Sequence, residues 1–145
     1  VWVPWLDKYF YSSSALPPWV VRLWADIEER DTYISPAEAL VAACAYVTFG
    51  WLLRGRLVHH FVDNDAAKVG LIKGTSSSPH TSVVLLDYHI ATVELQCDPW
   101  IGFVYSEDNL SDPPSRGDFR LMESLGAEFR PMCFPALRGH HGTPG

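Results

Sequence analysis

The sequence lacks the features that mark secreted, membrane-spanning and cysteine-based proteins. Its three cysteines are far apart and form no Cys-x-x-Cys pair, which argues against a disulfide framework or a zinc site and favours core thiols in a reducing compartment. No apolar run reaches the roughly 18 residues that a membrane span requires, and no basic-then-apolar leader is visible. We therefore expect an intracellular protein, in the cytoplasm or the nucleus, without a membrane partner.

Several catalytic motifs are also missing. The chain has no G-x-S-x-G nucleophile motif and no glycine-rich phosphate loop, so neither a serine hydrolase nor a phosphate-loop protein has support. His59 and His60 are neighbours in an expected strand and point to opposite faces, which disfavours a histidine metal site.

The net charge of -6 argues against a dedicated non-specific nucleic-acid binder. An enzyme whose acids hold metal ions remains compatible with this charge.

What is present fits one ordinary globular domain of 145 residues, 48% of them hydrophobic. The expected elements are a bent strand pair, or a strand and its turn, over 1–11, helices over 16–29 and 35–53, a strand over 57–62, helices over 65–73 and 80–97, a strand over 100–105 and a helix over 115–125. Strands that alternate with helices predict an α/β domain with a mixed sheet. We expect residues 1–126 to form this domain and residues 127–145 to form a tail or linker.

The most informative stretch is LVHHFVDNDAAKVGLIKG, residues 57–74. Its apolar, β-branched beginning predicts a buried strand that ends at Asp63. Asn64 is a suitable N-cap for the helix that follows, and Gly74 is a suitable C-terminal cap. Because ligand chemistry gathers at the carboxyl ends of strands in open α/β sheets, Asp63 is a candidate ligand for a hard cation.

Two further acids have comparable positions. Glu38 lies three residues after Ser35 in an S-x-x-E pattern, and its simplest role is in a helix capping box. Asp112 precedes Pro113 and Pro114, and its simplest role is in a turn or an N-cap. Taken together with Asp63, however, these acids come from separate elements, as the carboxylates of a two-Mg²⁺ site do.

Three segments resemble the ribonuclease H domain of retroelement reverse transcriptases. They are the strand–DN–AA…LIKG pattern of residues 61–74, the I-S-P-A-E of residues 34–38, and W-I-x-F-V-x-S-x-x-N-x-x-D-x-x-S-R of residues 100–116. The most specific part is the closing N-x-x-D-x-x-S-R block, formed by Asn109, Asp112, Ser115 and Arg116. The resemblance covers residues 1–119 and preserves the order of the segments.

The resemblance implies a ribonuclease H-like fold, a five-stranded mixed sheet with helices on both faces. It implies that the first, central strand and its aspartate are missing from this chain. Asp7 is the only candidate for that acid here, and its surroundings look more like the second strand and its turn. Since the sequence also begins without methionine, we expect the first strand to lie upstream of Val1 in a longer polypeptide.

The resemblance also implies an activity. Glu38, Asp63 and Asp112 would be the catalytic, metal-binding acids of a nuclease that hydrolyses the RNA strand of an RNA–DNA hybrid with two Mg²⁺ ions, or with Mn²⁺ in their place. The neighbouring reverse transcriptase domain of the same polyprotein would be a partner. The expected contacts to nucleic acid are Asn64, Ser106, Asn109 and Arg116.

Three other interpretations stay open at this point. The chain is either an inactive, truncated relic of a retroelement, or a non-catalytic interaction module, to which its six tryptophans would be suited, or another nuclease of the same superfold, such as an integrase-like or exonuclease-like enzyme. The nuclease interpretations depend on Asp63, whereas the interaction module does not.

Overall fold

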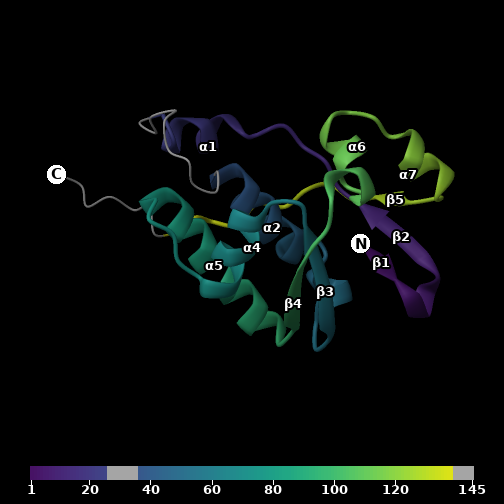
Figure 1. Ribbon diagram of the computed structural model, residues 1–145, viewed down its shortest axis with the longest axis horizontal. Coiled ribbons are helices and arrows are strands. Elements are labelled where there is room, and N and C mark those ends of the chain that lie inside the picture. The colour runs from purple at the N-terminus through teal and green to yellow at the C-terminus, as the bar shows by residue number, and fades with distance from the viewer. Residues whose placement is uncertain (26–35, 139–145) are drawn as a thin grey trace.

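A computed structural model describes residues 1–25 and 36–138 and shows a mixed α/β protein (Figure 1). Its strands form two separate small sheets in the described residues, one of β1, β2 and β5 and one of β3 and β4. This differs from the single mixed sheet that the sequence predicted. The α/β class itself is confirmed.

The first sheet is built on an amino-terminal hairpin. β1 (Trp2–Val3) and β2 (Lys8–Tyr11) are antiparallel and are joined by the 3-10 helix η1 (Pro4–Leu6). Asp7 closes this turn with a left-handed φ of 47°. The expected bent strand pair is therefore confirmed, and Asp7 lies in its turn.

The second sheet is a parallel pair. β3 (Leu57–Val62) and β4 (Asp98–Phe103) are aligned from Leu57 opposite Asp98 to Val62 opposite Phe103. The amide of Asp98 donates to the carbonyl of Arg56 and that of Val104 to Val62, both at 2.9 Å. In this register the even-numbered backbone groups of β3 face β4, and those of Leu57, His59 and Phe61 face the opposite edge. No strand of the described residues pairs with that edge.

One face of the parallel pair packs against helices (Figure 1). α4 (Asp65–Lys73) contacts both strands, and the rings of Tyr46 and Tyr88, from two longer helices, lie near His60 of β3. α2 (Pro36–Thr48) and α5 (Pro79–Leu95) pack against each other, and the rings of Tyr46 and Tyr88 meet edge to face at 5.0 Å. Val58 and Val62 of β3 pack against the core that these helices form. The small side chains of α2, among them the buried Ala39, Ala42 and Ala43, allow this close approach.

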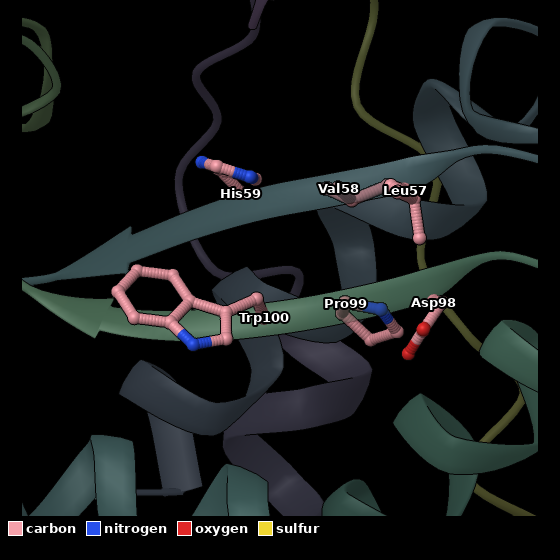
Figure 2. Close-up of a pocket in the computed structure, with 6 residues that line it drawn as sticks. All are labelled: Leu57, Val58, His59, Asp98, Pro99 and Trp100. Atoms are coloured by element: carbon pink, nitrogen blue, oxygen red, sulfur yellow. The ribbon is translucent and has the colours of Figure 1, made fainter.

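The other face of the parallel pair is exposed, and Leu57 and Trp100 line a shallow hollow of about 350 Å³ beside it (Figure 2). Leu57 is 79%, Phe61 53% and Trp100 61% accessible to solvent. We expected helices on both faces, and for β3 and β4 this is wrong within the described residues. The apolar run of β3, Leu57, Val58, Phe61 and Val62, predicted a buried strand, but such a run carries no information about whether a covering element exists on each side.

The helices follow the sequence prediction where local signals are strong. α4 (Asp65–Lys73) has the expected bounds, and α5 begins one residue before the predicted 80–97 helix. The predicted 35–53 helix is divided at Phe49 into α2 and α3 (Gly50–Leu53), where a Cβ on Gly50 would meet Leu95 at 3.0 Å. Ser35, the expected cap, lies outside the described residues.

The remaining elements are short. α1 (Pro18–Leu23) forms the beginning of the predicted 16–29 helix, whose residues from 26 onwards lie outside the described part. The predicted 115–125 helix is replaced by α6 (Asp112–Ser115) and α7 (Arg120–Ser124), which are separated by Gly117 at a φ of 80°. The 3-10 helix η2 (Ser106–Asp108) precedes them. β4 begins two residues earlier than predicted, with Pro99 inside it.

Residues 127–138 pack against the rest of the chain. β5 (Glu128–Phe129) pairs in parallel with β2, and Glu128 forms ion pairs with Lys8 and, at 2.6 Å, with Arg130. Leu137 is 2% exposed and belongs to the core, and its amide donates to Oδ2 of Asp87 at 2.7 Å. We predicted a tail or linker from residue 127, whereas residues 128–129 pair with β2 and Leu137 lies in the core. Among the described helices, none is long and apolar enough to cross a membrane.

Candidate functional site

Asp63 lies where the sequence predicted it, directly after β3 at the carboxyl end of the parallel pair. It is half-buried between β3 and α4. The chain turns there because Asn64 adopts an extended conformation and caps α4, with its side-chain oxygen accepting a hydrogen bond from the amide of Ala67 at 2.9 Å. Gly74, at a φ of 74°, ends the helix as predicted.

Asn109 connects Asp63 to the loop that follows β4. Its amide nitrogen donates to Oδ2 of Asp63 at 3.1 Å. Its side-chain oxygen accepts from the amide of Ser111 at 3.0 Å, and its carbonyl accepts from the amide of Asp112 at 3.0 Å. One asparagine therefore holds Asp63 and fixes the backbone at Asp112.

Asp112 is the first residue of α6, and its carboxylate is paired with the guanidinium of Arg116 one turn later. The hydroxyl of Ser115 donates to the carbonyl of Asp112 at 2.6 Å. Ser115 and Arg116 of the D-x-x-S-R block thus both bond to Asp112. The Arg116 side chain is 71% exposed, so its pairing with Asp112 lies at the surface.

Glu38 lies in the first turn of α2 and is exposed. Across residues 1–25 and 36–138, no three or more His, Cys, Asp or Glu side chains are grouped so that they would hold a metal ion. Asp63 and Asp112 are therefore linked through Asn109, but the structure does not bring Glu38 together with them as one ligand set.

The other predicted contact residues have partly different roles. Asn64 uses its side-chain oxygen as a helix cap, and Asn109 is engaged by Asp63. Ser106 is exposed at the start of η2. Sequence analysis missed the link from Asn109 to Asp63, although the placement of Asn109 three residues before Asp112 was a visible signal.

Carboxylate oxygens are the donors that Mg²⁺ and Mn²⁺ prefer, so the donor chemistry of Asp63, Asp112 and Glu38 is suitable. Asn109 occupies one oxygen of Asp63 and Arg116 occupies the Asp112 carboxylate. The described residues therefore have the right kind of ligand but not a complete arrangement for two metal ions.

A separate polar cluster lies beneath β3. The hydroxyl of Tyr46 and Nδ1 of His60 are 3.2 Å apart, and the His60 ring lies 6.4 Å from that of Tyr88. Burial lowers the pKa of His60 to about 4, because the charged imidazolium is poorly solvated there. Burial also raises the pKa of Tyr88 to about 12. This cluster is neutral near pH 7, and its place among buried side chains fits a structural role.

Comparisons with family models, with curated proteins and with solved structures give no match to this chain.

Proposed function

We propose that the chain is a ribonuclease H-like part of a retroelement polyprotein that hydrolyses the RNA strand of RNA–DNA hybrids. The observation that carries this proposal is the connection from Asp63 through Asn109 to Asp112. It links the segment of residues 61–74 to the closing N-x-x-D-x-x-S-R block, the most specific part of the resemblance, at the carboxyl end of a parallel strand pair, where ligand chemistry gathers in α/β sheets.

The finer proposal for the fold is a ribonuclease H-like mixed sheet with one more strand between β1 and β3. Val1 and Phe10 exchange both backbone hydrogen bonds, at 2.7 and 2.8 Å, so the backbone groups of Trp2 point away from β2. The outer edges of β1 and β3 are both unpaired in the described part of the chain. The guanidinium of Arg56 lies 3.7 Å from the ring centroid of Trp5, which brings the hairpin close to the start of β3.

In the proposed nuclease, Glu38, Asp63 and Asp112 would hold Mg²⁺ or Mn²⁺, and the bound metal would supply activation of water and stabilisation of the leaving oxygen. Asn109 positions the Asp63 carboxylate. Arg116 pairs with the Asp112 carboxylate, and a metal ion would have to displace it there. A fourth ligand would come from the added strand.

The proposed substrate is an RNA–DNA hybrid that is recognised by its shape and its 2′-hydroxyl groups. Ser106 is exposed at the start of η2, three residues before Asn109, and is a candidate contact to sugar or phosphate. Because the chain carries a net charge of -6, we propose that the neighbouring reverse transcriptase domain supplies much of the affinity for the polyanion.

The test is cleavage of a labelled RNA–DNA hybrid in Mg²⁺ or Mn²⁺. It compares the chain, a version extended upstream of Val1 to carry the expected strand and its aspartate, and the extended version with Asp63→Asn. We expect cleavage by the extended form and its loss in Asp63→Asn. Asp65→Asn is the matched control, since Asp65 is an exposed aspartate two residues away on α4. A folded extended form that leaves the hybrid intact contradicts the proposal.

A second candidate function is that of a non-catalytic interaction module, and an inactive, truncated relic of a retroelement is a separate alternative. The exposed apolar side chains on the outer face of β3 and β4 favour the interaction module. In that case Asp63→Asn changes neither metal binding nor any catalytic readout. An integrase-like or exonuclease-like nuclease would instead cut DNA in the same assay.

A further inference from the structure

Cys133 lies against the carboxyl-terminal end of α2. Its amide donates to the hydroxyl oxygen of Thr48 at 2.9 Å, and the same hydroxyl lies 3.5 Å from its carbonyl oxygen. The segment that carries Cys133, drawn in yellow in Figure 1, passes beside α2 on its way from β5. Two contacts with one side chain fix the backbone of Cys133 at a single place on this helix.

Cys44 lies on the same face of α2, one helical turn before Thr48. Residues four apart on a helix are neighbours, with about 5–6 Å between their Cβ atoms. A helical side chain also leans toward the turn that precedes it, so the Thr48 hydroxyl holds the backbone of Cys133 over the turn that contains Cys44. Met132 and Phe134, which flank Cys133, pack against the core to which Cys44 belongs.

The third cysteine is placed differently. Tyr46 of α2 faces α5, because its ring meets that of Tyr88 at 5.0 Å. Cys44 is two residues away from Tyr46, which turns it to nearly the opposite side of the helix. Cys97 follows the end of α5, where its thiol donates to the carbonyl of Thr92 at 3.7 Å. The geometry therefore pairs Cys44 with Cys133 rather than with Cys97.

The two thiols differ in their surroundings. Both are free, but Cys44 is 1% exposed whereas Cys133 is exposed. Burial raises the pKa of the Cys44 thiol to about 12, and the charge of Cys133 is the next largest cause of the rise. Repulsion between two thiolates falls with distance, so this effect agrees with the nearness that the Thr48 contacts indicate. A small oxidant in solution reaches Cys133 first.

We propose that Cys44 and Cys133 form a redox-sensitive disulfide that fastens residues 130–137 to α2. The oxidant is a disulfide, and glutathione disulfide is the probe. The Cys133 thiolate attacks one sulfur of glutathione disulfide, the S–S bond breaks and one glutathione thiolate leaves. Cys44 then loses its proton to water and attacks the sulfur of Cys133, which releases the second glutathione. Two protein thiols are oxidised, and one glutathione disulfide is reduced to two glutathiones.

The bond would join two distant parts of the chain. A link from residue 44 to residue 133 closes a loop of about 90 residues, which strongly restricts the unfolded chain. In the reduced protein the segment is held by its contacts with Thr48 and by the buried Leu137. In the oxidised protein it stays attached to α2 even when these contacts break. Spacing along the sequence did not predict the pair, because packing of the last described segment creates it.

The experiment incubates the folded chain with glutathione disulfide, without denaturant, and follows its mass after the free thiols are unfolded and alkylated. The first product should be a mixed disulfide of Cys133 and glutathione, since Cys133 is exposed and the Cys44 thiol is rarely ionised. It should then convert to an intramolecular disulfide, which peptide mapping assigns to Cys44 and Cys133 and which dithiothreitol reverses. This disulfide should raise the midpoint of thermal unfolding by about 10 °C.

Three single variants separate the roles of the cysteines. Cys44→Ala should stop at the mixed disulfide. Cys133→Ser, a change at an exposed position, should lose both the intramolecular product and the gain in thermal stability. Cys97→Ser is the matched control and should oxidise and gain stability as the unchanged chain does.

A Cys133 that stays bonded to glutathione while Cys44 stays free overturns the proposal, because the two sulfur atoms are then out of reach of each other. A disulfide between two copies through Cys133, or a bond to Cys97, also overturns it, as does an equal gain in stability by Cys133→Ser. The pair uses none of the acids of the proposed nuclease. Failure of hybrid cleavage therefore contradicts only the nuclease, and failure of the disulfide contradicts only this pair.

Discussion

Asn109 is the residue on which the candidate site depends most. It bonds Oδ2 of Asp63 and the backbone of both Ser111 and Asp112. Residues that orient a metal-binding carboxylate typically change metal affinity by about 10- to 100-fold when they are removed. In the active, extended form, Asn109→Ala should therefore raise the Mg²⁺ concentration for half-maximal hybrid cleavage by at least about tenfold. Asp108→Asn changes an exposed neighbour and should leave that concentration unchanged.

His60 predicts a pH dependence of folding. Its pKa is about 4 in the folded chain against about 6.5 in an unfolded one, so the unfolded state binds the proton more readily. Its contribution to stability is complete above pH 6.5 and falls by about 3 kcal/mol as the pH decreases to 4. Urea unfolding at pH 7.5 and pH 4.5 measures this loss.

The matched variants separate His60 from the carboxyl groups that titrate in the same range. His60→Gln keeps a hydrogen-bonding group near Tyr46 without a titrating proton, so its stability should fall less between these two pH values. His59→Gln, an exposed neighbour on the same strand, should follow the unchanged chain. Parallel behaviour of His60→Gln and the unchanged chain would show that His60 does not carry the effect.

At the scale of elements, α4 depends on its N-cap. Asn64 satisfies the amide of Ala67, which has no carbonyl partner within the first turn of the helix. Asn64→Ala should lower the free energy of unfolding by about 1 kcal/mol, and Asn64→Asp should preserve it. Thermal unfolding followed by circular dichroism distinguishes the two, and equal losses in both would assign the effect to something other than capping.

Elements with strong local signals were predictable from the sequence. α4 was delimited by Asn64 and Gly74, whose conformations depend on near neighbours alone. The start of β4 was predicted two residues too late because Asp98 and Pro99 were interpreted as the break that ends the preceding helix. In the structure the amides of Asp98 and Val104 donate to β3, so position 99 faces the outer edge, where a residue without an N–H group is tolerated. This distinction depends on pairing between strands that lie far apart in the chain.

At the scale of the whole molecule, residues 127–138 contribute to stability. Leu137 is buried in the core, and its amide is bonded to Asp87. Leu137→Ala should lower the free energy of unfolding by about 2–3 kcal/mol. Leu110→Ala, at a leucine that is 48% exposed, should cost much less. Urea unfolding of both variants measures the difference, and equal stabilities would show that this segment is not part of the cooperative unit.

The candidate site could be predicted only in part, because its geometry depends on contacts between segments that lie far apart in the chain. The sequence indicated Asp63 and Asp112 through their positions next to a strand and a loop. It did not indicate that Arg116 would occupy the Asp112 carboxylate, nor that Glu38 would not be grouped with the other acids. It also did not indicate that the aromatic side chains of β3 and β4 would share an exposed face, because the register of two distant strands decides this.

The unpaired edge of β3 also affects how the isolated chain behaves at high concentration. A free strand edge is a template for pairing with other chains, and β3 carries neither proline nor lysine, two residues with which proteins protect such edges. Charge repulsion between copies is weakest near the isoelectric point of about 5.4. Self-association through β3 should therefore limit the solubility of the chain most severely in mildly acidic buffers, and a covering strand should relieve it.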